Sequence, residues 1–380
     1  MTNKFYQQFR LGVLGGGQLG RMLIQSGIDL NIEFNVLDPD ANAPCSQISH
    51  FTCGKLTDFD TVMAFGEKCD LITIEIENVN IDALKELVKK GKKVFPQPEV
   101  IELIQDKRVQ KQFYKEHGIP TAEFILTENR SDVLKYASAF VPSAHKLGKG
   151  GYDGQGVQII RSTDDLHKAF DAPGVLEKLI DFEKEIAVIV SRNERGEVRV
   201  FPSVEMVFHP EANLVEYLLS PAQIDDALEN RAAEIATSII EKLKMVGILA
   251  VEMFLTKDHK LLVNEIAPRP HNSGHHTIEA NATSQYQQHL RAILGLAPGN
   301  TEAILPAAMV NLLGEEGHTG VANYSGLEEV LAITGTHVHL YGKKMTKPFR
   351  KMGHVTIVDR DVDSLKKKID FVKKTLKVTT

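Results

Sequence analysis

Two carboxylates fall in neighbouring apolar segments in the last third of the chain. Glu252 lies within LAVEMFL (249–255), Asn264 and Glu265 lie within LLVNEIA (261–267), and the turn KDHK separates the two segments. This spacing predicts a β-hairpin in which Glu252 and Glu265 face each other. Carboxylates among Leu, Val and Ile repel each other and are poorly solvated unless a cation lies between them. We therefore predict a Mg²⁺ site, because oxygen ligands without thiolates favour that ion; Mn²⁺, or a solvated hairpin face without metal, is the alternative.

A dense polar loop follows this hairpin directly. It carries Arg269, His271, Asn272, His275 and His276 among proline, glycine and serine. Polar side chains at this density are typical of a binding loop rather than of packing, so we predict a substrate site. Zinc is the rival ligand, but the spacing matches neither HExxH nor a cysteine–histidine set.

The segment GGYDGQG (150–156) is the first of two glycine-rich segments that could cradle an anion. A strand carrying Lys146 precedes it and a second strand follows it. This pattern predicts an antiparallel hairpin rather than the strand-to-helix turn of a Walker A loop, and GK[ST] is missing. A flexible hairpin tip of this kind could close over nucleotide phosphates as a lid.

The second glycine-rich segment is LGGGQLGRM (14–22). Gly15, Gly17 and Gly20 match the dinucleotide pattern G-x-G-x-x-G, and Asp38 lies near the spacing of a ribose-binding acid. A nicotinamide oxidoreductase is therefore one hypothesis. The same turn also suits any phosphate at a helix N-terminus, or the glycines only tighten the turn. Asp38 precedes Pro39 and is equally well explained as a strand-end cap.

The elements around this turn alternate between strands and helices. RLGVLGGG and EFNVLDPD predict strands on either side of the helix QLGRMLIQSGIDL, and CDLITIEIENV predicts a buried strand that leads to Glu75 and Glu77. The helix IDALKELVKKG follows. This alternation predicts a parallel, doubly wound sheet.

Two further segments are less specific. GVLEKLIDFEKEIAVIV (174–190) would place Glu177 to Ile180 along a strand edge suited to adenine and ribose, and an ordinary amphipathic edge strand is the alternative. Near the C-terminus, THVHLYGK and KMGHVTIV predict strands and DVDSLKKKIDFVKKTL predicts an amphipathic helix. Most of this C-terminal part is expected to serve packing.

Composition limits the class of protein. The 380 residues include 44 basic and 50 acidic side chains, a formal charge of −6, which argues against a sequence-independent grip on nucleic acid. The three cysteines form no CxxC pair, and MTNKFYQQFR lacks an apolar signal core. No stretch reaches membrane-spanning length. We expect a cytoplasmic protein of two or three domains without a nucleic-acid or membrane partner.

Five segments together resemble the ATP-grasp superfamily, and within it the N5-carboxyaminoimidazole ribonucleotide synthetases of purine biosynthesis. They are GGGQLGRM (15–22), EIEN (75–78), GGYDGQG (150–156), NEIAPRPHNSGHHTIEA (264–280) and YGK…RKMGH (341–354). They run through almost the whole chain, and APRPHNSGH is much more specific than either glycine-rich segment.

The resemblance implies an α/β and α+β architecture, the ATP-grasp fold. Its parts would be a Rossmann-like N-terminal domain at 1–104, an ATP-grasp domain at 105–298 with a lid subdomain at about 120–182, and a small β-rich domain at 299–380. It also implies a homodimer. No mutase domain follows residue 380, so we expect the product to pass to a separate mutase.

The resemblance also assigns roles to residues. ATP contacts would be Lys107, Lys146, Gly151, Tyr152, Asp153, Gly154, Gln155, Gly156, Val157, Glu177, Lys178, Leu179, Ile180, Glu185, His209, Asn264 and Glu265. The ribonucleotide would meet Gln18, Leu19, Glu75, Glu77, Asn272, Lys343, Arg350 and Lys351. Residues gathered around the carboxylation step would be Tyr152, Asp153, Arg269, His271 and Lys343, with Glu252 and Glu265 on the metal.

The implied reaction is the ATP- and bicarbonate-dependent carboxylation of 5-aminoimidazole ribonucleotide, with carboxyphosphate formed and ADP and phosphate released. Asp153 or His271 could take the amine proton, and either carboxyphosphate or CO₂ could be attacked. A nicotinamide dehydrogenase, a non-catalytic ATP-binding regulator and a formate-dependent glycinamide ribonucleotide ligase are the competing hypotheses.

Overall fold

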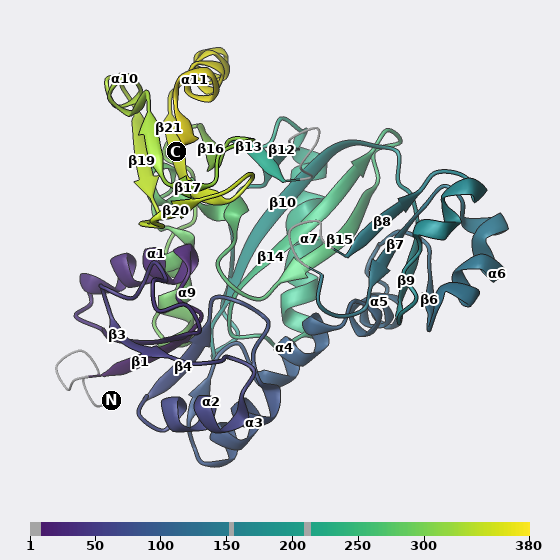
Figure 1. Cartoon of the computed structure of the whole chain (residues 1–380), viewed down its shortest axis with the longest axis horizontal. Coiled ribbons are helices and arrows are strands. Elements are labelled where there is room, and N and C mark those ends of the chain that lie inside the picture. The colour runs from purple at the N-terminus through teal and green to yellow at the C-terminus, as the bar shows by residue number, and fades with distance from the viewer. Residues whose placement is uncertain (1–8, 152–155, 209–213) are drawn as a thin grey trace.

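The computed structural model describes residues 9–151, 156–208 and 214–380. Tyr152, Asp153, Gly154, Gln155 and His209 therefore lie outside the described residues. Figure 1 shows a long central sheet that reaches the C-terminal strands at the upper left, with the N-terminal region at the lower left and a small sheet at the far right. Among the described residues, none of the helices has both the length and the apolar character needed to cross a bilayer.

The N-terminal region is a five-stranded sheet in the order β3-β2-β1-β4-β5, and every pairing in it is parallel. This confirms the sheet predicted from the alternation of strands and helices. Buried Leu11, Val13 and Phe34 pack its core. The elements are β1 (Arg10–Leu14), α1 (Gln18–Ile28), β2 (Glu33–Asp38), β3 (His50–Cys53), α2 (Phe59–Gly66), β4 (Leu71–Ile74), α3 (Ile81–Lys89) and β5 (Lys93–Val94).

The small sheet at the right of Figure 1 is antiparallel, in the order β6-β9-β7-β8. We call it the lid sheet. Lys146 pairs with Val157 across β7 and β8, which confirms the predicted hairpin around GGYDGQG. Its elements are β6 (Phe124–Thr127), α6 (Arg130–Phe140), β7 (Ser143–Leu147), β8 (Val157–Ile160), the 3₁₀ helix η2 (Thr163–Lys168) and β9 (Gly174–Lys178).

One prediction for the lid sheet is wrong. β9 lies between β6 and β7, so Glu177 and Lys178 belong to an interior strand rather than to a strand edge. Leu179 and Ile180 lie beyond the end of β9, in the connection to the next strand. The physical reason is that β9 pairs with a strand on each side, β6 and β7, and approaches β7 so closely that a Cβ on Gly174 would collide with the Lys146 carbonyl oxygen.

The central sheet has nine strands in the order β15-β14-β10-β12-β13-β16-β21-β19, with β11 paired to β10. The pairing of β13 with β16 joins the C-terminal strands to the rest, so one sheet runs from the cavity described below to the C-terminal region. Its strands are β10 (Phe182–Arg192), β11 (Val198–Val200), β12 (Val204–Phe208), β13 (Val215–Ser220), β14 (Gly247–Thr256), β15 (Leu261–Ala267), β16 (Ala307–Leu313), β19 (Thr336–Leu340) and β21 (Lys351–Val358).

Helices pack against this sheet, and four short strands form two separate two-stranded sheets. The apolar face of α7 (Asp226–Lys242) packs with residues of β10 and β14 in the largest apolar cluster. The helices are α4 (Pro98–Gln105), α5 (Lys107–Glu116), η3 (Asn272–Gly274), α8 (Thr277–Ala280), α9 (Gln285–Ile293), α10 (Leu327–Leu331) and α11 (Val362–Thr375). The short strands are β17 (Gly320–Val321), β18 (Asn323–Ser325), β20 (Met345–Thr346) and β22 (Lys377–Thr379).

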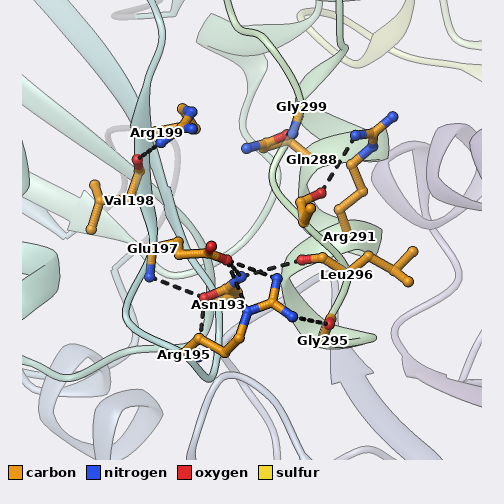
Figure 2. Close-up of polar contacts among 11 residues, drawn as sticks. Asn193, Arg195, Glu197, Val198, Arg199, Gln288, Arg291, Gly295, Leu296 and Gly299 are labelled. Carbon is orange, nitrogen blue, oxygen red and sulfur yellow. Dashed lines mark hydrogen bonds and ion pairs between the residues drawn. The ribbon is translucent and has the colours of Figure 1, made fainter. Parts of the chain in front are cut away.

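A tight turn after β10 joins separate parts of the chain (Figure 2). Buried Asn193 donates through Nδ2 to Glu197 Oε2 at 2.6 Å and to the Leu296 carbonyl at 3.2 Å. Arg195 reaches the Gly295 carbonyl at 3.3 Å. Lys93, at the end of the N-terminal sheet, forms an ion pair with Glu194 of the same turn at 2.7 Å. The turn therefore fixes the N-terminal region and the segment after α9 against the central sheet.

Candidate active site

A cavity of about 580 Å³ is lined by residues of the lid sheet, the central sheet, the N-terminal region and the C-terminal strands. It contains most of the site residues expected from the sequence. Those in its lining are Gln18, Leu19, Glu75, Glu77, Lys146, Val157, Glu177, Lys178, Leu179, Ile180, Glu185, Glu252, Asn264, Glu265, Arg269, His271, Asn272 and Lys351.

Five other expected residues are not part of the described lining. Lys107 reaches the cavity through its 2.6 Å ion pair with Glu265. The Gly156 carbonyl accepts a hydrogen bond from the Leu147 amide and so belongs to the hairpin, next to which Gly151 lies. Lys343 donates to the carbonyl of Lys351 at 2.7 Å, whereas Arg350 donates to the Met345 carbonyl.

Glu252 and Glu265 are direct cross-strand partners on β14 and β15, which confirms the predicted hairpin geometry. Lys107 lies 2.6 Å from Glu265 Oε2 and lowers the pKa of that carboxyl to about 2. Burial, with Glu265 close by, raises the pKa of Glu252 to about 8, and its neighbour His271 lies at 3.5 Å. The protein thus stabilises the ionised form of Glu252 less than that of Glu265, and a bound cation would favour ionisation of Glu252 more.

The described residues of the cavity offer oxygen donors for part of a Mg²⁺ coordination shell. Within the described part of the chain, no group of three or more His, Cys, Asp or Glu side chains is placed to hold a metal by itself. Mg²⁺ in nucleotide sites is typically bound by one or two carboxylates together with phosphates and water. Glu252 and Glu265, with the Asn264 amide beside them, are oxygen donors of the kind that such a shell takes from a protein.

A second charged cluster joins the lid sheet to β15. Lys146 lies 3.2 Å from Glu177 Oε2 and donates to Asn264 Oδ1 at 2.8 Å. Lys111, on α5, contacts the same Glu177 oxygen at 3.3 Å. Burial raises the pKa of nearby Glu185 to about 7.

Sequence reasoning missed Lys111 and two phenylalanines. Lys111 is 2% exposed, and a signal was present: Lys107, Lys111 and Tyr114 follow the spacing of one helical face. Phe182 and Phe254 stack with ring centroids 4.9 Å apart and line the cavity. Their contact depends on the register between β10 and β14, which the sequence does not reveal.

The N-terminal glycine turn binds the chain's own carboxylates. The amides of Gly17 and Gly20 donate to the two oxygens of Glu75 at 2.8 and 2.9 Å. The Gly16 amide donates to Asp38 at 2.7 Å, so Asp38 acts as the strand-end cap that the sequence left as one alternative. These amides are therefore not open to a dinucleotide phosphate, which removes the main argument for the dehydrogenase hypothesis.

The polar loop after β15 connects the two ends of the cavity. Arg269 Nε lies 2.8 Å from Glu77 Oε1 of the N-terminal region. His271 has Ser273 Oγ at 2.9 Å from Nδ1 and Glu252 at 3.5 Å from Nε2. The loop thus places one guanidinium and one imidazole between the carboxylate pair and the N-terminal glycine turn.

Comparison with known proteins agrees with this architecture. A model of the ribonucleotide synthetase preATP-grasp domain matches residues 9–105, a model of the ATP-grasp domain matches 112–286, and a model of the phosphoribosylaminoimidazole carboxylase C-terminal domain matches 307–368. The chain is 34% identical to the N5-carboxyaminoimidazole ribonucleotide synthase of Bacillus subtilis, over 93% of this chain and 92% of that one. The chain belongs to the N5-carboxyaminoimidazole ribonucleotide synthase family.

Solved structures of this synthase family share the fold. The crystal structure of the synthetase from Thermotoga maritima matches with a TM-score of 0.90 and 44% identity, covering 98% of this chain and 99% of that one. The synthase from Aspergillus clavatus, solved in complex with ADP and 5-aminoimidazole ribonucleotide, matches with a TM-score of 0.89 and 34% identity, covering 97% and 98%. The resemblance to the ATP-grasp fold is thereby confirmed.

Some of the proteins that this chain matches are longer. This chain spans 65% and 66% of the length of the phosphoribosylaminoimidazole carboxylases of Vigna aconitifolia and Candida albicans, with 38% identity to each.

Proposed function

We propose that this protein catalyses the ATP- and bicarbonate-dependent carboxylation of 5-aminoimidazole ribonucleotide to N5-carboxyaminoimidazole ribonucleotide, a step of purine biosynthesis that releases ADP and phosphate. One observation carries the proposal: a single cavity holds an opposed carboxylate pair, a lysine on the lid sheet and the Arg269–His271 loop. The family relationship supports it, because the Aspergillus clavatus relative binds ADP and 5-aminoimidazole ribonucleotide together.

In this proposal the nucleotide lies between the lid sheet and β14–β15. Lys107 and Lys146 are the cations for its phosphates, and both already contact carboxyl or amide oxygens that a phosphate could replace. Phe182 and Phe254 offer an apolar wall for a base. The segment Gly151–Val157 would close over the phosphates and shield carboxyphosphate from water; of its members, Tyr152 to Gln155 lie outside the described residues.

Glu252 and Glu265 are the residues that would hold Mg²⁺. When bound, this ion supplies positive charge where negative charge develops between the β and γ phosphates. The raised pKa of Glu252 supports the assignment, because a buried carboxyl that is hard to ionise becomes a carboxylate when a cation neutralises it.

The ribonucleotide is proposed to lie at the other end of the cavity. Gln18, Leu19, Glu75, Glu77 and Asn272 line that end together with Lys351, and Lys343 and Arg350 would add basic groups near the phosphate. The planar fork of Arg269 suits the two oxygens of bicarbonate, and Glu77 orients it. Asp153 or His271 would accept the amine proton.

Several wider properties belong to the same proposal. We propose the domain limits 1–104, 105–298 and 299–380, and a homodimer. Cys45, Cys53 and Cys69 are free thiols, which suits a reducing compartment such as the cytoplasm. Light scattering on the purified protein tests the dimer: a monomer mass at micromolar concentration contradicts it.

The test of the reaction is ADP release measured with ATP, Mg²⁺ and 5-aminoimidazole ribonucleotide, with and without bicarbonate. We expect turnover that needs all four, together with a carboxylated product. ATP binding without turnover would instead identify a regulator. Saturable NADH binding at micromolar concentration without ATP hydrolysis would favour the dehydrogenase.

A further inference from the structure

Lys111 is a buried cation that none of the assigned roles uses. It lies on α5 and is 2% exposed, and its ammonium group is held by three neighbours. Nζ donates to Thr121 Oγ1 at 2.5 Å, lies 3.3 Å from Glu177 Oε2, and sits 5.7 Å from the centre of the Tyr114 ring. Burying an ammonium group is unfavourable unless it is paired, so the chain tolerates this lysine for a reason that apolar packing does not supply.

The contacts of Lys111 belong to a closed ring of hydrogen bonds and ion pairs that connects α5, β15 and the lid sheet. Thr121 Oγ1 in turn donates a hydrogen bond to the Val263 carbonyl on β15 at 2.7 Å. Asn264, the next residue of β15, accepts a hydrogen bond from Lys146 Nζ at 2.8 Å. Lys146 Nζ also forms an ion pair with Glu177 Oε2 at 3.2 Å. The ring therefore runs from α5 to β15, across to the lid sheet, and back to α5.

Three members of this ring, Lys146, Glu177 and Asn264, line the cavity. Both lysines contact Oε2, whereas Oε1 is buried and accepts no hydrogen bond from the described residues. Among these residues, the acceptor capacity of Oε1 is thus unused. Lys146 and Glu177 both belong to the lid sheet, so a shift of that sheet would move them together. Lys111 contacts Glu177 Oε2 from α5, which lies outside the lid sheet, and so fixes the carboxylate relative to the rest of the molecule.

We propose that Lys111 is a positioning residue for the nucleotide: it holds the Glu177 carboxylate, and through it Lys146, in the geometry that ATP meets. Lys111 itself does not touch the nucleotide. The inference rests on the proposed nucleotide site, and it predicts an effect on ATP that is separate from any effect on the ribonucleotide.

The decisive variant is Lys111→Met, which keeps the length of the side chain and removes its charge. We expect the dissociation constant for ATP, measured by calorimetry without the second substrate, to rise roughly tenfold, because one charge-assisted contact to Glu177 is lost. The Michaelis constant for 5-aminoimidazole ribonucleotide should stay within twofold. Lys115→Met is the matched control, since Lys115 is exposed on the same helix, and it should bind ATP like the wild type.

A structural role alone would lower the melting temperature of Lys111→Met and leave its ATP affinity unchanged, and that result overturns the proposal. Equal weakening of both substrates overturns it as well. If Lys111→Met does not fold, Thr121→Val opens the same ring by removing one hydroxyl, and unchanged ATP affinity in Thr121→Val contradicts the proposal.

A double-mutant cycle tests the route of the effect. If Lys111 acts through Glu177, Lys111→Met should weaken ATP binding far less in a Glu177→Gln background than in the wild type. Full additivity contradicts the route. A wild-type protein that binds ATP but forms no carboxylated product would refute the proposed reaction, whereas the role of Lys111 is still read from ATP binding alone.

Discussion

Carboxylates lie at both ends of the cavity, but their partners differ. At the N-terminal end, Glu75 accepts hydrogen bonds from the backbone amides of Gly17 and Gly20. At the other end, Glu265 pairs with the Lys107 side chain, and Glu252 has His271 at 3.5 Å. Backbone amides at a helix start are fixed, whereas lysine and histidine side chains can change partners when a ligand arrives.

The difference explains why the glycine pattern of the N-terminal turn is misleading. A helix N-terminus attracts anions, and G-x-G-x-x-G normally leaves that position to a phosphate. Here a carboxylate from β4's end occupies it, so the turn serves as architecture and positions Glu75 beside the cavity. Among the described residues, no backbone amide donates to the acidic pair on β14 and β15, which instead has the side chains of Lys107 and His271 beside it.

The largest effect should follow from removing the charge of Glu265, at the end of the cavity where side chains rather than backbone amides contact the carboxylates. Glu265→Gln keeps the size of the side chain and should lower the rate of ADP release roughly a hundredfold or more, because charge developing on the phosphates loses its stabilisation. Steady-state ADP release at saturating Mg²⁺ measures it. Glu205→Gln, on β12 and paired with Lys184, is the control and should keep normal turnover. Wild-type activity in Glu265→Gln at limiting Mg²⁺ would show that the pair holds no metal.

The ribonucleotide end should respond in its Michaelis constant instead. Lys351→Ala removes a basic side chain from the cavity lining and should raise the Michaelis constant for 5-aminoimidazole ribonucleotide roughly tenfold, the usual effect of losing a charge-assisted hydrogen bond. ATP binding without that substrate should not change. Lys347→Ala removes an exposed lysine of the same connection and serves as the control. Loss of ATP binding in Lys351→Ala would contradict the assignment of the two ends.

Glu75→Gln tests the end that is built from backbone amides. The glutamine side chain has one acceptor oxygen for two amide donors, so the start of α1 should lose one hydrogen bond and shift. We expect about a fivefold rise in the Michaelis constant for the ribonucleotide and unchanged ATP affinity. Substrate titrations at fixed ATP measure the change. A hundredfold loss of turnover, as large as that of Glu265→Gln, would mean that Glu75 takes part in the chemistry rather than in positioning.

Much of this geometry could be predicted because it is local. The parallel N-terminal sheet follows from alternating strands and helices, and the opposition of Glu252 and Glu265 follows from a short turn that fixes the register. The hairpin around GGYDGQG is of the same kind. In each case the sequence between the paired residues is short enough to determine their contact.

The features that could not be predicted depend on contacts between residues that are far apart in the sequence. The sequence gives no sign that β9 lies between β6 and β7, or that Phe182 and Phe254 stack across β10 and β14. Lys111 was missed because a lysine in a helix is normally exposed, and only tertiary packing buries it. The carboxylate that fills the N-terminal glycine turn comes from a different strand, so the turn's own sequence does not reveal it.

The smallest expected effect is on the free energy of unfolding. Two buried groups have shifted pKa values that change this free energy in opposite directions as the pH falls. Burial lowers the pKa of His276 from 6.5 to about 4 and raises that of Glu252 to about 8. Below pH 6.5 the unfolded chain protonates His276 while the folded chain does not, so stability falls as the pH drops from 6.5 toward 4. Glu252 has the opposite sign: the folded chain binds its proton first, so its contribution to stability grows as the pH falls from 8 toward 4.5.

His276→Gln separates these contributions. His276 is fully buried, and at pH 5.5 its neutral state should lower the free energy of unfolding by about 1 kcal/mol relative to pH 7.5, a loss that the glutamine variant avoids. Urea unfolding of both proteins at pH 7.5 and 5.5 measures the difference. His337→Gln removes an exposed histidine of β19 and should follow the wild-type pH dependence. If His276→Gln loses as much stability on acidification as the wild type, the acid sensitivity comes instead from other buried histidines, His275, His289 and His354, whose pKa values burial also lowers.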